Sequence, residues 1–391
     1  MTTTELPDDF YVGTPMAQDR TAAMEYLRRP GPVYRVGPTW IIASYDGVRF
    51  AQKNPDIFSS EKAFDGVANA IKMIPLAIDP PKHADYRRVL DPMFGPKRMD
   101  AMDADLRAQL RRHIDQFAPL GRCDVVEDLS YKFPTQAILT LFGLPLEHLP
   151  QFLDWTYGII KEANVSSLGD EPTPRVIECS MALFGFLAEQ LEAKRRHPGE
   201  DMLSAILAID GDDAWTDEEI LGLCFLIVLA GLDTVTGAIG YSLLTLAKDP
   251  ALRRKLIDDP ALISPFVEEV LRLDGPVPGV PRRTTRDVEV EGVTIPADSQ
   301  VMLLLGTANR EVPSAAEHPH EMDLTAKPTH LGFGGGIHRC LGSHLARREL
   351  RLTIEEFHAR IPEYRLAGEA KTLWPAGTLG LESLPLEFEP C

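Results

Sequence analysis

FGGGIHRCLG, residues 333–342, is the most informative stretch of this 391-residue chain. Its three consecutive glycines let the backbone pass close to a flat ligand, because they carry no Cβ. The stretch delivers one cysteine, Cys340, to the predicted start of a helix that runs from Leu341 to about Arg360. Backbone amides and the positive end of a helix stabilise a thiolate. A buried structural cysteine at a helix N-terminus is the alternative that these ten residues leave open.

The same stretch resembles the haem-binding signature FGxGxHxCxG of the cytochrome P450 family at every fixed position. By that resemblance Cys340 is the axial thiolate ligand of a haem b iron. A thiolate ligand pushes electron density towards the iron and favours O–O cleavage. The resemblance implies further cofactor contacts at Phe333, Gly334, His338 and Gly342. It covers about Phe58 to Glu389 and is nearest to soluble bacterial enzymes of the camphor-hydroxylase type.

A second motif, AGLDT at residues 230–234, lies inside the nearly all-apolar segment Ile220–Ala247. Glycine in a helix interior costs about 1 kcal/mol relative to alanine, and a buried aspartate costs more unless it is paired. A polar kink satisfied within the helix is the alternative to a functional site. The motif resembles the family's (A/G)GxDT oxygen-activation site, where Thr234 hydrogen-bonds dioxygen or a water, Asp233 relays protons and the glycine loosens the helix. The resemblance also implies cofactor contacts at Ala230 and Gly231.

Glu269 and Arg272 lie three residues apart on a helix predicted from near Pro260 to Leu273. Side chains at i and i+3 share a helix face, so the two can pair. Such a pair is usually solvated. The resemblance instead implies the buried structural pair behind the haem.

Four basic residues match family positions that bind the haem propionates. DPPKHADYR, residues 79–87, resembles the family's DPPxHxxxR and implies His83 and Arg87. Arg282 stands ten residues before Gly292, as in the family's R…G strand, although Arg283 is its neighbour. The fourth is His338. Arginine–carboxylate contacts are charge-assisted and directional, but each residue taken singly would more commonly be solvated.

Helical periodicity dominates the rest of the chain and predicts a mainly α protein with small β-sheets, the cytochrome P450 fold, as one haem-binding domain over 1–391. Residues 1–15 are expected to be loosely ordered. A hairpin around Trp40 should lead into a helix with Val48 and Phe50 on its apolar face. Stretches up to about Pro32 and from Phe58 to Asp79 are expected to be irregular. Further helices are predicted at 98–117, 135–141, 149–162 and 175–196, with Thr216 as the N-cap of the long apolar helix, and β structure at 287–303 and 379–390.

Composition excludes several classes of protein. The net charge of −18 disfavours nucleic acid and anionic membranes as partners. Five widely spaced cysteines without a CxxC predict no disulfide framework and indicate a cytoplasmic protein. The N-terminus shows no signal peptide. Segment 220–247 is long enough for a membrane span, but its polar centre favours a buried helix and no membrane anchor.

By resemblance, the chain inserts one oxygen atom of O2 into an apolar small molecule, such as a terpenoid or branched lipid. The chain carries no flavin or nicotinamide fingerprint, so electrons should come from a ferredoxin and its NAD(P)H-dependent reductase. Two alternatives are a peroxide-driven peroxygenase and a non-enzymatic haem carrier or sensor. Peroxygenases of this fold typically carry Arg-Pro where this chain has Asp233-Thr234, and a carrier needs no such pair.

Two surfaces are also expected from the resemblance. The substrate pocket is expected to be lined by Phe64, Ile71, Met73, Leu226, Leu229, Val277, Thr378 and Leu381. Lys72 could anchor a carboxylate at the entrance of the pocket, so fatty acids remain candidate substrates. The ferredoxin should dock behind Cys340 on Lys97, Arg98, Arg107, Arg111, Arg112 and Arg339, for which an ordinary solvated basic helix is the alternative.

Overall fold

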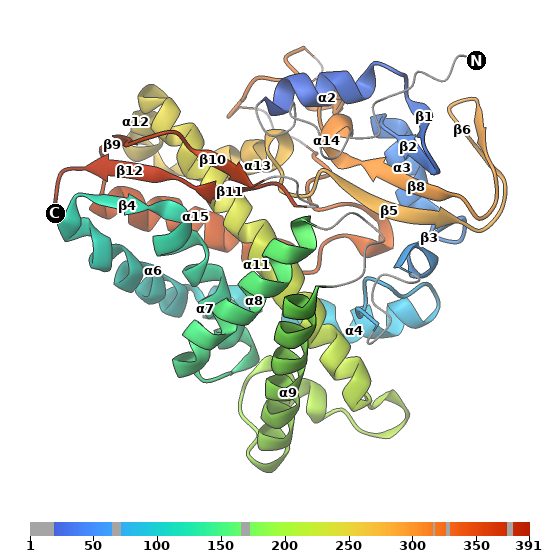
Figure 1. The fold of residues 1–391 in the computed structure, drawn as a ribbon, viewed down its shortest axis with the longest axis horizontal. Helices are drawn as coiled ribbons and strands as arrows, with labels where there is room; N and C mark the ends of the chain where they lie inside the picture. Colours follow the sequence, from blue (N-terminus) through green and yellow to red (C-terminus); the bar gives the residue numbers. More distant parts are fainter. Residues whose placement is uncertain (1–18, 65–71, 166–172, 316, 326–328, 374–377) are drawn as a thin grey trace.

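The computed structural model describes residues 19–64, 72–165, 173–315, 317–325, 329–373 and 378–391. Helices form most of the molecule, as predicted (Figure 1). They are α2 (Arg20–Arg28), α3 (Tyr45–Lys53), α4 (Lys82–Met93), α5 (Pro96–Ala101), α6 (Asp103–Phe117), α7 (Lys132–Phe142), α8 (Leu149–Val165), α9 (Pro174–Arg196), α10 (Met202–Leu207), α11 (Asp217–Lys248), α12 (Pro250–Asp258), α13 (Ile263–Leu273), α14 (Leu305–Ala308) and α15 (Ser343–Arg360).

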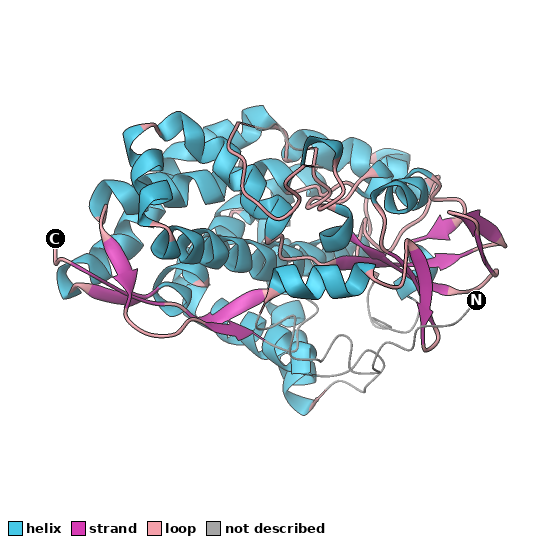
Figure 2. Cartoon of the chain, turned by 90° about the horizontal axis from the view of Figure 1, so that it is seen from above, coloured by secondary structure: helices cyan, strands magenta, loops and turns pink. Residues whose placement is uncertain are grey.

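The strands form small sheets at two ends of the helical body (Figure 2). A five-stranded sheet near the N-terminal part has the order β1-β2-β8-β5-β3, and the others are β4-β12-β9, β10-β11 and β6-β7. The strands are β1 (Val33–Val36), β2 (Thr39–Ile42), β3 (Phe58–Ser59), β4 (Arg122–Asp124), β5 (Gly279–Thr284), β6 (Val288–Val290), β7 (Val293–Ile295), β8 (Gln300–Leu304), β9 (Tyr364–Leu366), β10 (Lys371–Leu373), β11 (Gly380–Ser383) and β12 (Pro385–Phe388).

The long helix α11 runs through the middle of the molecule (Figure 1). Thr216 caps it as predicted: its side chain accepts the Glu219 N–H, and the Glu219 side chain accepts the Thr216 N–H. α11 packs against α7, α9, α13 and α15. It is apolar and long enough to cross a membrane, but 67% of its most apolar stretch is buried inside the molecule. The predicted central core helix is therefore confirmed.

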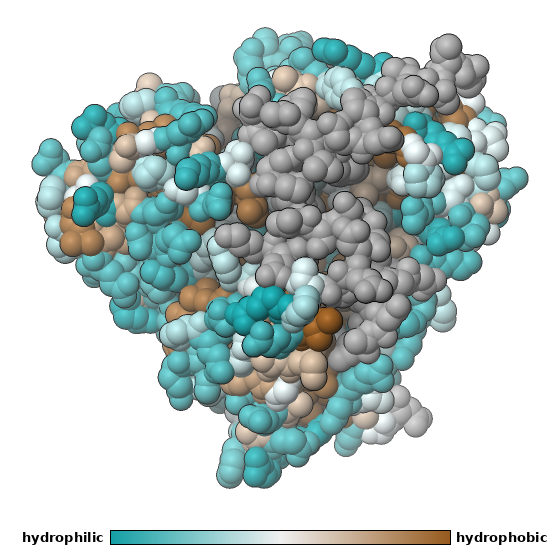
Figure 3. All heavy atoms as spheres, in the orientation of Figure 1, coloured by the Kyte–Doolittle hydropathy of each residue, from teal (hydrophilic) through white to brown (hydrophobic). Residues whose placement is uncertain are grey.

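On the face drawn in Figure 3, hydrophilic residues dominate the described surface and hydrophobic ones form small groups. The large hydrophobic side chains gather inside, in a cluster that joins α6, α7, α11, α13 and α15. A second cluster lies between α3 and the five-stranded sheet. These two cores hold the elements that frame the site.

Several boundaries predicted from the sequence are wrong. α2 lies in the stretch expected to be irregular, with its Asp19 cap and buried Met24 and Leu27 packed against distant strands. α4 and α12 were not predicted. The helix expected over 98–117 is two helices that meet at Met102. Phe50 is 39% exposed, whereas Val48 is buried, so only Val48 lies on the apolar face of α3. Residues 1–15, which were expected to be loosely ordered, lie outside the described part of the chain.

Candidate active site

A cavity lies between α11 on one side and the 333–342 loop with the start of α15 on the other. The loop stays close to α3 because a Cβ on Gly336 would lie 1.9 Å from the Gln52 carbonyl oxygen. Gly334 and Gly336 have φ of 64° and 63°, a region that strongly favours glycine. The sequence pattern predicted a close approach of this backbone to a flat ligand, whereas the close approach seen at Gly336 is to α3. α15 itself begins at Ser343, so Cys340 precedes the helix rather than opening it.

Cys340 faces this cavity, whereas Cys123, Cys179 and Cys224 are buried elsewhere and Cys391 ends the chain. The Cys340 N–H donates to the Phe333 carbonyl oxygen at 2.9 Å, which closes the loop. Burial raises the pKa of the Cys340 thiol. A hydrogen bond from the Gly342 N–H and the charges of three nearby arginines lower that pKa and favour the thiolate.

Two histidines at the cavity have unsatisfied nitrogens. The rings of His83 and His338 lie 4.4 Å apart, and Nε2 of each is buried without a hydrogen-bond partner among the residues that the structure describes. Burial, helped by Arg282 and other nearby cations, lowers the pKa of His338 to about 3. Such orphaned nitrogens are expected where a ligand supplies the missing partner.

Three arginines lie near these histidines: Arg87 and Arg339 line the cavity, and the charge of Arg282 acts on His338 although Arg282 is not among the lining residues. Arg282 is 6% exposed, and burial lowers its pKa to about 10. Its neighbour Arg283 is bound instead to Asp298 at 2.7 Å, so the structure favours Arg282 at the site. Arg87 donates to the Arg339 carbonyl oxygen at 2.8 Å and pairs with Asp91. These residues fit a ligand that carries carboxylate groups, such as the two propionates of haem.

The AGLDT motif divides between two faces of α11. Ala230, Gly231 and Thr234 line the cavity. The Thr234 hydroxyl donates to the Ala230 carbonyl oxygen at 2.7 Å. Asp233 is 7% exposed, is not among the cavity-lining residues, and accepts a hydrogen bond from Thr378. Burial raises the pKa of Asp233 to about 6. α11 is continuous through the motif, so the expected loosening at Gly231 is not seen.

Glu269 and Arg272 form a buried ion pair behind the loop. Two hydrogen bonds of 2.7 and 2.8 Å join them, and each side chain is 1% exposed. Arg272 also donates to the carbonyl oxygens of Pro319 and Glu321. The pair therefore pins the segment before the loop, and removing one partner would leave a buried charge uncompensated.

A family model described as Cytochrome P450 matches residues 261–358. Cytochrome P450 130 of Mycobacterium tuberculosis is 32% identical over 93% of this chain and 93% of its own length. The chain belongs to the cytochrome P450 family. Vitamin D(3) 25-hydroxylase of Pseudonocardia autotrophica is 32% identical over 98% of this chain and 96% of its own length. The crystal structure of CYP109E1 from Bacillus megaterium in complex with testosterone has a TM-score of 0.84 at 30% identity, covering 96% of this chain and all of that one.

The P450 fold and the enzyme class predicted from the sequence are thereby confirmed. Relatives named hydroxylase and monooxygenase make this P450 an oxidoreductase. Family membership also gives the cofactor, haem b with an axial cysteine thiolate. The orphaned histidine nitrogens and the buried Arg282 fit that cofactor.

The predicted substrate-lining residues of this P450 separate into three groups. Leu226 and Val277 line the cavity. Four others are not among its lining residues: Met73, Leu229, Thr378 and Leu381. Ile71 and the side chain of Phe64 lie outside the described residues. Leu229 is five positions before Thr234, which places it about 140° away on a helix, whereas Ile227, seven positions before, shares the face of Thr234 and lines the cavity.

Glu349 is a further cavity residue, which was not predicted from the sequence. It lines the cavity from α15, its Oε1 has no hydrogen-bond partner within the described part of the chain, and burial raises its pKa well above the ordinary value. Periodicity could have found it, because Leu345, Ala346 and Glu349 follow one helix face from the Cys340 loop. The physical cause is that burial disfavours the charged form of the carboxyl group.

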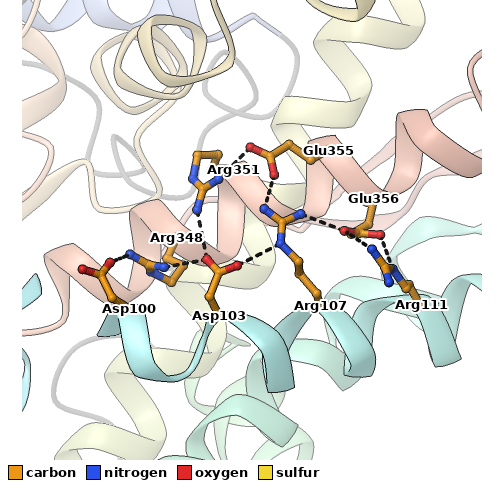
Figure 4. Close-up of polar contacts among 8 residues, drawn as sticks. All are labelled: Asp100, Asp103, Arg107, Arg111, Arg348, Arg351, Glu355 and Glu356. Carbon is orange, nitrogen blue, oxygen red and sulfur yellow. Dashed lines mark hydrogen bonds and ion pairs between the residues drawn. The ribbon is translucent and has the colours of Figure 1, made fainter. Parts of the chain in front are cut away.

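The six basic residues expected to bind a ferredoxin differ in whether their charges are paired within the protein. Arg107 and Arg111 belong to a network of eight charged residues that joins α5 and α6 to α15 (Figure 4). Its members are Asp100, Asp103, Arg107, Arg111, Arg348, Arg351, Glu355 and Glu356, four of each sign. Arg98 donates to the Glu200 carbonyl oxygen. Lys97, Arg112 and Arg339 are exposed and form no ion pair with the part of the chain that the structure describes.

Proposed function

We propose that this P450 inserts one oxygen atom of O2 into a C–H or C=C bond of a mid-sized apolar molecule, with Cys340 as the haem ligand. The observation that carries the proposal is the cavity itself, which has Cys340 on one wall and Thr234 on the other. The haem supplies dioxygen activation, and the chain supplies binding, proton delivery and a dry pocket. The second oxygen atom leaves as water.

Four residues would hold the cofactor through its propionates: His83, Arg87, Arg282 and His338. Support comes from the two orphaned Nε2 atoms and from the burial of Arg282. Cofactor contacts at Ala230, Gly231, Phe333, Gly334 and Gly342 agree with their places in the cavity wall. The Glu269–Arg272 pair acts behind the loop as a structural support.

Thr234 and Asp233 would deliver protons. The Thr234 hydroxyl faces the cavity and can turn from its present acceptor, the Ala230 carbonyl, towards dioxygen or a water. Asp233 takes up and releases protons readily near neutral pH, because burial raises its pKa to about 6. This pair supports the monooxygenase over a peroxygenase or a haem carrier, neither of which needs it.

An apolar substrate is supported by the wall of the cavity. Leu76, Ile227, Val280 and Leu305 join the predicted Leu226 and Val277 there. Lys72 is hydrogen-bonded to Glu61, so it is not a free anchor for a carboxylate. The relatives named for vitamin D(3) hydroxylation and solved with testosterone act on or bind large apolar molecules. A terpenoid, sterol-like or branched lipid substrate agrees with these features.

Electrons would come from a ferredoxin and its NAD(P)H-dependent reductase. The unpaired cations Lys97, Arg112 and Arg339 are candidates to meet an acidic partner. We also infer a cytoplasmic protein, built as one domain over 1–391. Closeness to camphor-hydroxylase-type members stays a prediction.

Replacing the ligand tests the proposal. Cys340→Ala should abolish the thiolate-type Soret band of the reduced carbon monoxide complex, whereas Cys391→Ala, at the exposed end of the chain, should keep it. Apolar ligands added to the wild type should shift the haem absorption on binding. A thiolate band that survives in Cys340→Ala would refute the ligand, and a screen in which only highly polar compounds bind would refute the substrate class.

A further inference from the structure

Glu268 lies at the centre of a polar cluster beside the Cys340 loop, and the proposed function makes no use of it. Its carboxylate accepts two hydrogen bonds from Arg347, of 2.6 and 2.8 Å. It also lies 3.0 Å from Nε2 of His330. α13 supplies the carboxylate and α15 the guanidinium, while the imidazole precedes the loop. Three separate segments therefore meet at one carboxylate.

Both partners of Glu268 reach the loop. The Arg347 guanidinium lies over the ring of Phe333, with 4.4 Å between Cζ and the ring centroid. The Gly332 N–H donates to Nδ1 of His330 at 3.0 Å. That nitrogen therefore carries no proton, so the imidazole proton sits on Nε2 and is donated to Glu268. One carboxylate thus orders two consecutive loop residues, Gly332 through His330 and Phe333 through Arg347.

The cluster also bears on the charge near Cys340. Burial alone would raise the pKa of Glu268, but hydrogen bonds from Arg347 and His330 lower it to about 2, so the carboxylate is ionised at neutral pH. Arg347 is one of three arginines whose positive charge favours the thiolate form of Cys340, together with Arg87 and Arg339. The ionised Glu268 offsets the charge of Arg347, because the two groups are in direct contact.

We propose that Glu268 is a positioning residue that tunes the reduction potential of the haem, by holding Arg347 on the loop and offsetting its charge. The inference rests on the proposed function, because it needs haem bound at Cys340. Reduction adds an electron to the iron, so a nearby positive charge raises the potential and a negative charge lowers it. The two members of the pair should therefore act in opposite directions.

The test is the midpoint potential of the purified haem-loaded protein, measured by spectroscopic redox titration. Glu268→Gln should raise the potential, since Arg347 is then uncompensated. Arg347→Gln should lower it, since Glu268 is then uncompensated. The double variant should lie between the two and close to the wild type. A purely structural role predicts a different pattern, in which both single variants shift the potential in the same direction because each loosens the same loop.

Two further variants sharpen the result. Arg348→Gln changes the next residue of α15, whose guanidinium pairs with Asp100 and Asp103 rather than Glu268 (Figure 4). It should move the potential less than Arg347→Gln. Arg347→Lys keeps the charge but loses the two-pronged contact. It should leave the potential near that of the wild type while lowering the melting temperature, and it carries the test if a glutamine variant fails to bind haem.

The spectrum of the reduced carbon monoxide complex distinguishes a failure of the proposed function from a failure of the role proposed for Glu268. If the wild type itself lacks the thiolate band, the proposed function is overturned and this inference falls with it. If the band is present and the single variants shift the potential in the same direction, or leave it unchanged, only the role of Glu268 is overturned.

Discussion

Thr234 offers a direct test of oxygen activation. Thr234 lines the cavity, and its hydroxyl donates to the Ala230 carbonyl oxygen. Thr234→Ala should keep haem binding and NAD(P)H consumption largely intact, yet lower the ratio of product formed to NAD(P)H consumed, because electrons escape to peroxide or water. That ratio is the measurement. Retention of the wild-type ratio would show that Thr234 does not orient oxygen.

A neighbouring threonine provides the matched control. Thr236 is on the same helix but is buried, and its hydroxyl donates to the Ser130 carbonyl oxygen at 2.7 Å, away from the cavity. Thr236→Ala should reduce the free energy of unfolding by about 1 kcal/mol through the lost hydrogen bond. It should leave the product ratio unchanged.

Asp233 makes stability depend on pH. Burial raises its pKa in the folded protein to about 6, from an ordinary value of 3.8. The folded state is therefore penalised as pH rises through 4 to 6, where the aspartate ionises. Asp233→Asn should be more stable than the wild type at pH 7 to 8, by up to about 3 kcal/mol at 1.36 kcal/mol per pKa unit. The difference should disappear below about pH 4.

Denaturant unfolding of both proteins between pH 4 and 8 measures this difference. A constant offset at every pH would contradict the raised pKa. The same variant should also slow turnover, because general acid–base contributions run at roughly 100- to 10,000-fold.

Among the elements, α11 and β11 are held in close contact by a glycine. A Cβ on Gly237 would lie 2.5 Å from the Leu379 carbonyl oxygen, a backbone atom that cannot move alone. Gly237→Ala should therefore destabilise the protein by about 1–3 kcal/mol through overpacking. It should also weaken the hydrogen bond from Thr378 to Asp233, since Thr378 directly precedes Leu379.

Gly185 of α9 is the control for this substitution, because a Cβ there would meet no atom within 4 Å. Gly185→Ala should stabilise the protein by about 0.5–1 kcal/mol, as alanine is the better helix former. Thermal unfolding compares the two variants. Equal effects of the same sign would refute the close approach of α11 and β11.

The distribution of charge over the molecule determines where an acidic partner can dock. The chain carries a net charge of −18, and the network of Figure 4 is balanced, so Arg107 and Arg111 have their charges neutralised. Lys97 and Arg112 are exposed and form no ion pair with any residue that the structure describes. Lys97→Glu with Arg112→Glu should slow ferredoxin-dependent reduction on the order of tenfold at low salt. The effect should shrink as ionic strength rises.

Stopped-flow reduction with a ferredoxin couple makes this measurement. Arg29→Glu with Arg35→Glu reverses two exposed charges at the end of α2 and in β1 and so makes the same change of charge elsewhere on the molecule. It should leave the rate unchanged. Equal rates for the charge-reversed and wild-type proteins at low salt would reject the patch.

Two motifs that carry the chemistry were predictable from the chain because each is locally unfavourable without a function: the consecutive glycines before Cys340 and the aspartate within an apolar helix. The Glu269–Arg272 pair is locally ordinary, and only the family resemblance predicted that it is buried. Thr216 was predictable for another reason, since a capping box is stabilising and involves only neighbouring residues. Fold class followed from periodicity and from the family resemblance.

Tertiary structure decided what depends on residues far apart in the chain. α2 is ordered by packing on the neighbouring strands β1 and β2 and also on the distant residues Leu304 and Leu379, and its own short sequence shows little of this. The choice of Arg282 over Arg283 depends on which side of β5 faces the cavity. Arg283 lies on the opposite side of the strand, where it pairs with Asp298. Asp233 meets Thr378, and Glu268 joins Arg347 to His330, across three segments. Local propensity cannot encode such contacts, because burial and charge pairing are properties of the assembled core.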